Sequence, residues 1–245
     1  MRIIYDNYLQ DSTLSATNEN LNKPVTNLIH NYLELEFKAT ANNSVITITF
    51  DSPQAIDAFC YGYHNLSAMT LTFYDSGLNN LGNLSVTLES NEDVVYLEEE
   101  SSIDFSDIKK IEVTITTAET YVYLGSIFVS QFYQMPNFRM GLTGVKKIND
   151  SITKSPGGQV SGNKMTDLNQ WSIIFSYITN IQKNTILSYI KIVKLSTGHY
   201  IDLYEAAHDY FLPFYGHVIN NEIELSKRRI SDWEWDLSID YEEAR

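Results

Sequence analysis

The sequence is poor in the features that stabilise small exported proteins or anchor membrane proteins. It contains one cysteine, Cys60, in 245 residues, which excludes a disulfide within the chain. We expect a buried free thiol in a protein that folds in a reducing cytoplasm, with a nucleophile or metal ligand as the alternative for this residue. No stretch approaches the roughly 20 apolar residues of a membrane-spanning helix, and the N-terminus lacks the apolar core of a signal peptide. We therefore expect a soluble protein that is not exported by a cleaved signal and has no membrane partner.

Basic residues are scarce in the first half of the chain. Residues 1–140 carry 6 Lys and Arg against 18 Asp and Glu, a net charge of −12, whereas residues 141–245 carry 11 against 13, a net charge of −2. The acidic half should be repelled by nucleic acid, so no nucleic-acid partner is expected. Aromatic residues make up 13% of the chain, including 17 tyrosines. Such a content suits strand surfaces, subunit interfaces or sugar-stacking platforms, and composition does not choose among them.

Helical periodicity is scarce as well, and alternating apolar and polar residues are common. The alternation predicts strands near residues 44–50, 55–63, 69–74, 84–88, 94–97, 110–116 and 121–128, separated by turn residues. This pattern is typical of a β-sandwich or jelly roll. The sequence therefore predicts a mainly β protein: a jelly-roll domain over 1–136, a Gly- and Pro-containing linker or long loop over 137–164, and a smaller β-rich domain over 165–245 with about one helix, at 184–195.

The last residues of the chain give the clearest strand signal. From Trp233 to Glu242, apolar and polar side chains alternate without a break. Such a strand must pair with an earlier strand of its own domain or with a neighbouring subunit. We predict an assembly interface, whose members are Tyr215, Lys227, Arg228, Arg229, Trp233 and Trp235. The alternatives are a solvated turn for the basic cluster and a core position for the tryptophans.

No pattern in the sequence indicates catalysis. The five histidines lack the i, i+4 spacing with which one helix presents two zinc ligands, and the carboxylate runs lie at 98–100 and at the chain end. We expect no enzymatic activity and no cofactor, with a hydrolase of unrecognised acids as a weaker alternative. A calcium ion held by Asp or Asn oxygens near residues 75–80 or 91–93 stays open as a second alternative.

Several segments resemble a known family. Residues 27–31 (Asn-Leu-Ile-His-Asn), 44–50 (Ser-Val-Ile-Thr-Ile-Thr-Phe) and 56–67, which ends in His-Asn-Leu-Ser, resemble the discoidin-like, or galactose-binding-like, jelly-roll modules of tailed-bacteriophage structural proteins. Residues 123–129, 155–159, the strand at Trp171, 214–219 and 233–239 look like the second half of the same proteins. The chain departs from sugar-binding discoidins because its loops lack an obvious basic and aromatic cluster.

The resemblance implies a non-enzymatic structural component of a phage tail or neck. Such a protein would be located in the virion, be made in the host bacterial cytoplasm, and assemble with other virion proteins and with copies of itself, in a ring-like oligomer. The alternative that it implies is a carbohydrate-binding module for attachment to the host surface, with a host glycan as partner. In that case the expected ligand face contains His64, Asn65 and Tyr74.

Overall fold

A computed structural model describes most of the chain. The described residues are 2–30, 35–88, 92–97, 102–135, 143–147, 151–154, 160–163, 168–193, 198–202, 214–219, 225–227 and 235–243. They form two compact units, each built from separate stretches of the chain. The first unit contains residues 2–134 and 199–214, and the second contains residues 135–198 and 215–245.

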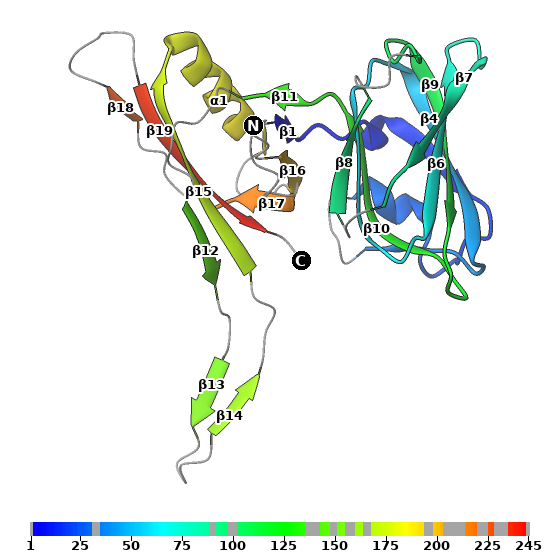
Figure 1. The fold of residues 1–245 in the computed structure, drawn as a ribbon, viewed down its shortest axis with the longest axis horizontal. Coiled ribbons are helices and arrows are strands. Elements are labelled where there is room, and N and C mark those ends of the chain that lie inside the picture. The colour runs from blue at the N-terminus through cyan, green and yellow to red at the C-terminus, as the bar shows by residue number, and fades with distance from the viewer. Residues whose placement is uncertain are drawn as a thin grey trace. The chain divides into compact units, whose positions relative to one another are not determined.

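The first unit contains two antiparallel sheets that form a jelly-roll sandwich (Figure 1). The five-stranded sheet has the order β2 (Ser12–Ala16), β4 (Asn43–Gln54), β9 (Ile108–Thr116), β6 (Ala68–Asp75), β7 (Asn80–Val86). The four-stranded sheet has the order β3 (Phe37–Lys38), β10 (Tyr123–Ser130), β5 (Ala58–His64), β8 (Glu92–Tyr96). Two short 3-10 helices, η1 (Tyr8–Asp11) and η2 (Val25–Ile29), belong to the same unit. The predicted mainly β fold with an N-terminal sandwich is confirmed.

The core of the sandwich follows from the period of two in its strands. In β4 the side chains of Ile46, Ile48 and Phe50 are fully buried, whereas Thr47 and Thr49 between them point to the opposite face. Neighbouring strands add buried apolar residues to the same cluster. Each such side chain contributes about 1.5–3 kcal/mol by leaving water, which is enough to fix the strand register.

The outer face of the four-stranded sheet is covered by further strands of the same unit. These are β1 (Arg2–Ile4), β11 (Tyr133–Gln134) and β16 (His199–Asp202), which pair in the order β11-β1-β16. The Tyr200 hydroxyl lies 2.7 Å from the Ser126 hydroxyl, and the Tyr200 ring packs edge-on against Phe128 at 5.4 Å. Burial on both faces explains why the residues of β10 from Leu124 to Ser130 are all buried instead of alternating between buried and exposed. A division at residue 136 alone does not describe this unit, because residues 199–202 complete it.

A buried polar cluster fastens β16 to β8. The Tyr96 hydroxyl donates a hydrogen bond to the carboxylate of Asp202, which is 2% exposed. The Arg2 guanidinium lies 4.1 Å from the centroid of the Tyr96 ring and 4.5 Å from that of Phe132. Burial, together with the Asp202 carboxylate, raises the pKa of Tyr96 far above its ordinary value, so the phenol stays protonated and keeps donating.

The second unit contains antiparallel strands and one α-helix. Its elements are β12 (Thr143–Lys147), β13 (Ser151–Lys154), β14 (Val160–Asn163), β15 (Leu168–Ile178), α1 (Asn180–Val193), β17 (Phe214–Val218), β18 (Leu225–Lys227) and β19 (Trp235–Glu243). Strand β19 lies between β15 on one side and β17 and β18 on the other, and β12 follows on the far side of β15. The predicted linker thus includes three strands. Within the described residues, no helix has the length and apolar character to cross a membrane.

The predicted terminal strand is present and pairs within its own unit. In β19, Leu237, Ile239 and Tyr241 are buried while the intervening polar residues are half-buried, as the alternation indicates. Helix α1 begins four residues earlier than predicted. Thr179 and Gln182 explain this start, because each side chain accepts a hydrogen bond from the other's backbone N–H, at 3.3 and 2.9 Å.

Candidate functional site

The three residues of the predicted ligand face do not lie together. His64 is the last residue of β5 and Asn65 follows it, close in sequence to the start of β6, whereas Tyr74 lies near the opposite end of β6. The seven residues from Ala68 to Tyr74 span about 20 Å of extended strand. His64 is 8% exposed, and its Nδ1 accepts a hydrogen bond from the Leu66 N–H. The expectation of a single face through His64, Asn65 and Tyr74 is therefore wrong, because a full strand length separates its members.

Asn65 instead clips the β9–β10 connection to the β5–β6 turn. Its Nδ2 group donates to Glu119 Oε2 at 3.0 Å and to the Tyr121 carbonyl at 2.8 Å. Its Oδ1 accepts from the Tyr123 N–H at 2.9 Å, and its own carbonyl accepts from the Thr117 hydroxyl. Every polar atom of the side chain is therefore bonded within the protein, and Asn65 holds Glu119 and Tyr121 in place.

Lys38 meets Tyr121 across the edge of the sandwich. The pairing of β3 with β10 places Lys38 opposite Tyr123, and the Lys38 Nζ atom lies 3.5 Å from the centroid of the Tyr121 ring. This short distance indicates a cation–π contact, which fixes the orientation of both side chains. The backbone supports it, because the Ala39 N–H donates to the Val122 carbonyl at 2.9 Å.

We call Lys38, Asn65, Glu119 and Tyr121 the loop-end site. In the part of the chain that the structure describes, Lys38 Nζ, Glu119 Oε1 and the Tyr121 hydroxyl have no hydrogen-bond partner. Glu119 is exposed, and Lys38 and Tyr121 are half-buried. The site thus brings together an ammonium group with three donors, a carboxylate acceptor and an aromatic ring beside one another.

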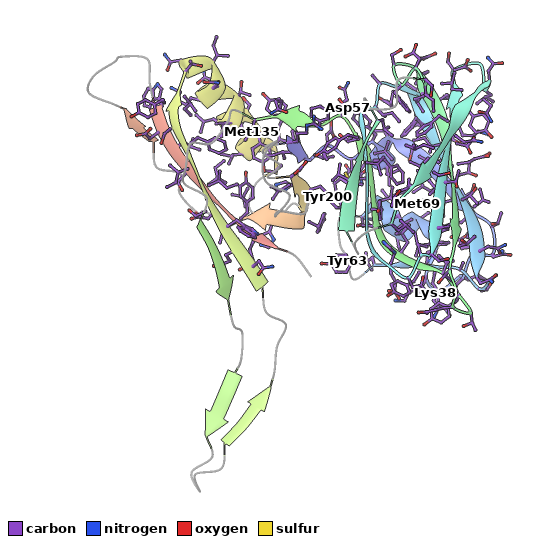
Figure 2. All side chains as sticks on the ribbon, viewed as in Figure 1. Lys38, Asp57, Tyr63, Met69, Met135 and Tyr200 are labelled. Carbon is purple, nitrogen blue, oxygen red and sulfur yellow. The ribbon has the colours of Figure 1, made fainter. Side chains whose placement is uncertain are left out.

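The loops around this site are locked to one another. Asn18 adopts a left-handed backbone (φ 55°), and its amide donates to the Asn43 carbonyl at 3.1 Å. The Asn18 carbonyl accepts from the Thr40 N–H at 2.7 Å. Lys38 and Tyr63 lie at the same end of the sandwich, and Asp57 lies at the other end (Figure 2). These bonds fix the loops before any ligand arrives, which lowers the entropy cost of binding.

Tyr63 is strained at the edge of this site. Its φ of 54° is rare for an aromatic residue. Gly125 lies opposite, and a Cβ atom on Gly125 would stand 2.8 Å from the Tyr63 Cβ. The glycine therefore leaves room for the left-handed backbone of Tyr63 near the end of β5.

Tyr74 belongs to a separate cluster on the outer face of the five-stranded sheet. Its hydroxyl donates to Glu112 Oε2 at 2.8 Å, and the Lys110 ammonium donates to Glu112 Oε1 at 2.9 Å. The Lys110 hydrogen bond holds the pKa of Glu112 below its ordinary value, and the bond to Glu112 raises the pKa of Tyr74. The three groups satisfy one another, so this cluster offers fewer free partners than the loop-end site.

Of the two positions left open for calcium, the one near residues 75–80 contains a hydrogen-bonded turn, and the one near residues 91–93 lies largely outside the described residues. The Asp75 carboxylate accepts from the Asn79 backbone N–H at 2.8 Å and from its side-chain amide at 2.9 Å, which lowers the pKa of Asp75. Residue 91 and the side chain of Asp93 are not among the described residues. Within the described part of the chain, no three His, Cys, Asp or Glu side chains are grouped as metal ligands. Cys60 is a buried free thiol.

The predicted assembly residues divide into two groups. Tyr215 is 2% exposed. It packs against Gly198, where an added Cβ atom would lie 2.0 Å from the Tyr215 hydroxyl. Tyr215 is therefore a core residue, which corrects its assignment to an interface. Trp235 is half-buried, and its Nε1 donates a hydrogen bond to Asn180 Oδ1 at 2.7 Å. The Lys183 Nζ atom lies 3.9 Å from the centroid of the Trp235 ring. Arg228, Arg229, Trp233 and the side chain of Lys227 lie outside the described residues, and their role stays a prediction.

The sequence did not reveal the loop-end site. Lys38 lies on β3 whereas Glu119 and Tyr121 lie on the β9–β10 connection, and no spacing pattern links the two segments. The signal that pointed nearby was the His-Asn-Leu-Ser turn, which contains Asn65. The sequence could not show that the Asn65 side chain is bonded to Glu119 and to the Tyr121 backbone and so positions both residues.

Comparison with known proteins returns similar structures only. No family model and no curated protein matches the chain. The lectin domain of lectinolysin, in complex with Lewis B antigen, is 10% identical, covers 51% of this chain and 96% of its own, and has a TM-score of 0.43. A fucose-binding module of Streptococcus pneumoniae is 14% identical, covers 54% of this chain and 99% of its own, and also has a TM-score of 0.43. The family 32 carbohydrate-binding module of C. perfringens NanJ, in complex with galactose, is 12% identical, with coverages of 54% and 100% and a TM-score of 0.42. The function proposed below therefore rests on residues of this chain.

Proposed function

We propose that the first unit is a non-enzymatic carbohydrate-binding module whose ligand lies on the loop-end site. The observation that carries the proposal is the grouping of three polar groups without a hydrogen-bond partner among the described residues: the Lys38 ammonium, the Glu119 Oε1 atom and the Tyr121 phenol. Sugars present neighbouring hydroxyls that both donate and accept hydrogen bonds, and an apolar C–H face. An ammonium donor, a carboxylate acceptor and an aromatic ring complement these features.

Each residue has a distinct role in this proposal. The Tyr121 ring gives the sugar a surface to pack on, while the Glu119 Oε1 atom accepts from a sugar hydroxyl and Lys38 Nζ donates to one. Asn65 is a positioning residue, because its side-chain atoms are already bonded to the β9–β10 connection. The neighbouring ammonium and carboxylate nearly cancel in charge, which suits a neutral sugar better than a strongly charged one.

A glycan array probed with the full chain tests the proposal, followed by calorimetric titration of the best ligand. We expect Tyr121→Ala to abolish binding, because it removes both the ring and its contact with Lys38. The matched control is Tyr74→Ala, which removes a half-buried tyrosine with its own lysine contact from the sheet face. Retained binding by Tyr121→Ala, equal loss in both variants, or an array without a hit would contradict the proposal.

A structural role in a larger particle is the second candidate. It follows from the resemblance to phage tail and neck proteins, and the observation that favours it is the small two-stranded sheet β13–β14 in the second unit. The similar structures named above are lectin and carbohydrate-binding domains and not virion proteins. Immunogold labelling of native phage particles tests the virion location, and particles without label would remove this candidate.

A further inference from the structure

The strands β13 and β14 form a sheet of only two strands. Ser151 pairs with Asn163, and the register continues without a break to Lys154 and Val160. Neither strand has another strand neighbour among the described residues (Figure 1). We call these two strands the ribbon. An isolated two-stranded hairpin is marginally stable in water, and its open edges present unpaired backbone donors and acceptors. The ribbon is therefore suited to pairing with another surface.

The charge of the ribbon and its flanks indicates the chemistry of that surface. The described strands β12, β13 and β14 together contain three lysines, Lys146, Lys147 and Lys154, and no acidic residue. Residues 1–140 carry a net charge of −12. Two ribbons would repel each other, and a nucleic acid would be repelled by the acidic unit that accompanies the ribbon. An acidic protein surface is the complementary partner, and the first unit of a second copy supplies one.

The described part of the first unit has exposed carboxylates at the end away from the loop-end site. Asp104 and Asp107 lie on the β8–β9 connection, and the Ser76 hydroxyl donates to Asp107 at 2.5 Å, which brings the β6–β7 turn beside them. Asp51 is also exposed, and its carbonyl accepts from the Lys109 ammonium. Binding at this end would leave Lys38 and Tyr121 accessible.

We propose that the ribbon docks onto the acidic first unit of a second copy of this chain, in a head-to-tail contact. A contact between two different surfaces of identical chains continues from copy to copy, and it produces a ring where the rotation closes and a filament where it does not. The inference is independent of carbohydrate binding, since it uses neither Lys38 nor Tyr121.

Sedimentation velocity of the full chain tests the contact over a range of concentrations and at low and high salt. We expect association that strengthens with concentration and weakens in high salt, because opposite charges are screened. Lys154→Glu, within the ribbon, should weaken association at least about fivefold. Lys191→Glu makes the same charge change on an exposed position of α1 and should leave association unchanged.

Charge restoration identifies the receiving surface. Mixing Lys154→Glu with the double variant Asp104→Lys, Asp107→Lys should restore the association that each lacks alone. A wild-type protein that stays monomeric at all concentrations would overturn the proposal, as would association that is insensitive to salt, or equal weakening by Lys154→Glu and Lys191→Glu. Failure of the mixture to associate, or salt-sensitive binding to an acidic oligonucleotide in place of self-association, would overturn the assigned partner. Loss of glycan binding with intact association would affect the proposed function alone.

Discussion

The substitution Asn65→Asp tests whether Asn65 fastens the loop-end site. In the native chain the Asn65 amide group donates to Glu119 at 3.0 Å and to the Tyr121 carbonyl at 2.8 Å, while Oδ1 accepts from the Tyr123 N–H. A carboxylate has almost the same shape and keeps the acceptor for Tyr123. It loses both donors and places a negative charge beside the Glu119 carboxylate and the Tyr121 carbonyl.

The expected cost is about 2–4 kcal/mol of unfolding free energy at pH 7. Two lost hydrogen bonds account for about 1–3 kcal/mol at their usual net value. Repulsion between two carboxylates about 4 Å apart adds about 1 kcal/mol even in water. The repulsion raises the pKa of the introduced carboxyl, so its part of the cost should shrink as the pH falls and the group becomes protonated.

Urea denaturation at pH 7 and at pH 4 measures both effects. The control is Ser67→Ala in the same turn, which removes one exposed 3.3 Å hydrogen bond and should change stability by less than about 0.5 kcal/mol. A loss below about 0.5 kcal/mol for Asn65→Asp at pH 7 would refute the role of Asn65 as a clip. A loss that grows at pH 4 relative to wild type would refute the electrostatic part.

Three further substitutions test other parts of the structure. Tyr96→Phe should cost about 1–3 kcal/mol in denaturation, because it removes the hydrogen bond from Tyr96 to the buried Asp202 carboxylate, and an unchanged midpoint would contradict the buried cluster. Gly125→Ala should cost about 1–3 kcal/mol by forcing a Cβ atom to within 2.8 Å of the Tyr63 Cβ, so an unchanged melting temperature would be the contrary result. Glu112→Gln should cost less than about 1 kcal/mol at pH 7, because the cluster is partly exposed. The pKa of Glu112 is lowered in the folded protein, so wild type keeps this advantage above the unfolded value of 4.5 and loses it as the pH falls through the folded value. A stability advantage of wild type over Glu112→Gln that grows as the pH falls would contradict this prediction.

Strands whose two faces differ were predictable from the sequence. The alternation in residues 44–50 and in the terminal segment gave β4 and β19, because one face of each strand is buried and the other is not. Helix α1 was predicted as well, although the capping pair Thr179 and Gln182 sets its start earlier than the apolar stripe indicates.

Contacts between distant segments were not predictable in the same way. The segment 199–202 completes the first unit through Tyr200 and Asp202, which contact strands 74 and 106 residues away in sequence. The loop-end site combines strand β3 with the β5–β6 and β9–β10 connections, and its members are brought together by backbone pairing and by the hydrogen bonds of Asn65. Local periodicity carries no information about such contacts. A turn signal shows only that a loop is present and not which other loop it meets.

Chemical-shift mapping with the strongest ligand from the glycan array tests the central claim most directly. The assigned amide spectrum of the full chain is recorded while the sugar is added. Carbohydrate binding at the loop-end site predicts saturating shifts that cluster at residues 38–40, 65–67 and 119–123, with the β6–β7 turn at 75–79 unaffected. Saturating shifts confined to any other part of the molecule would contradict the account.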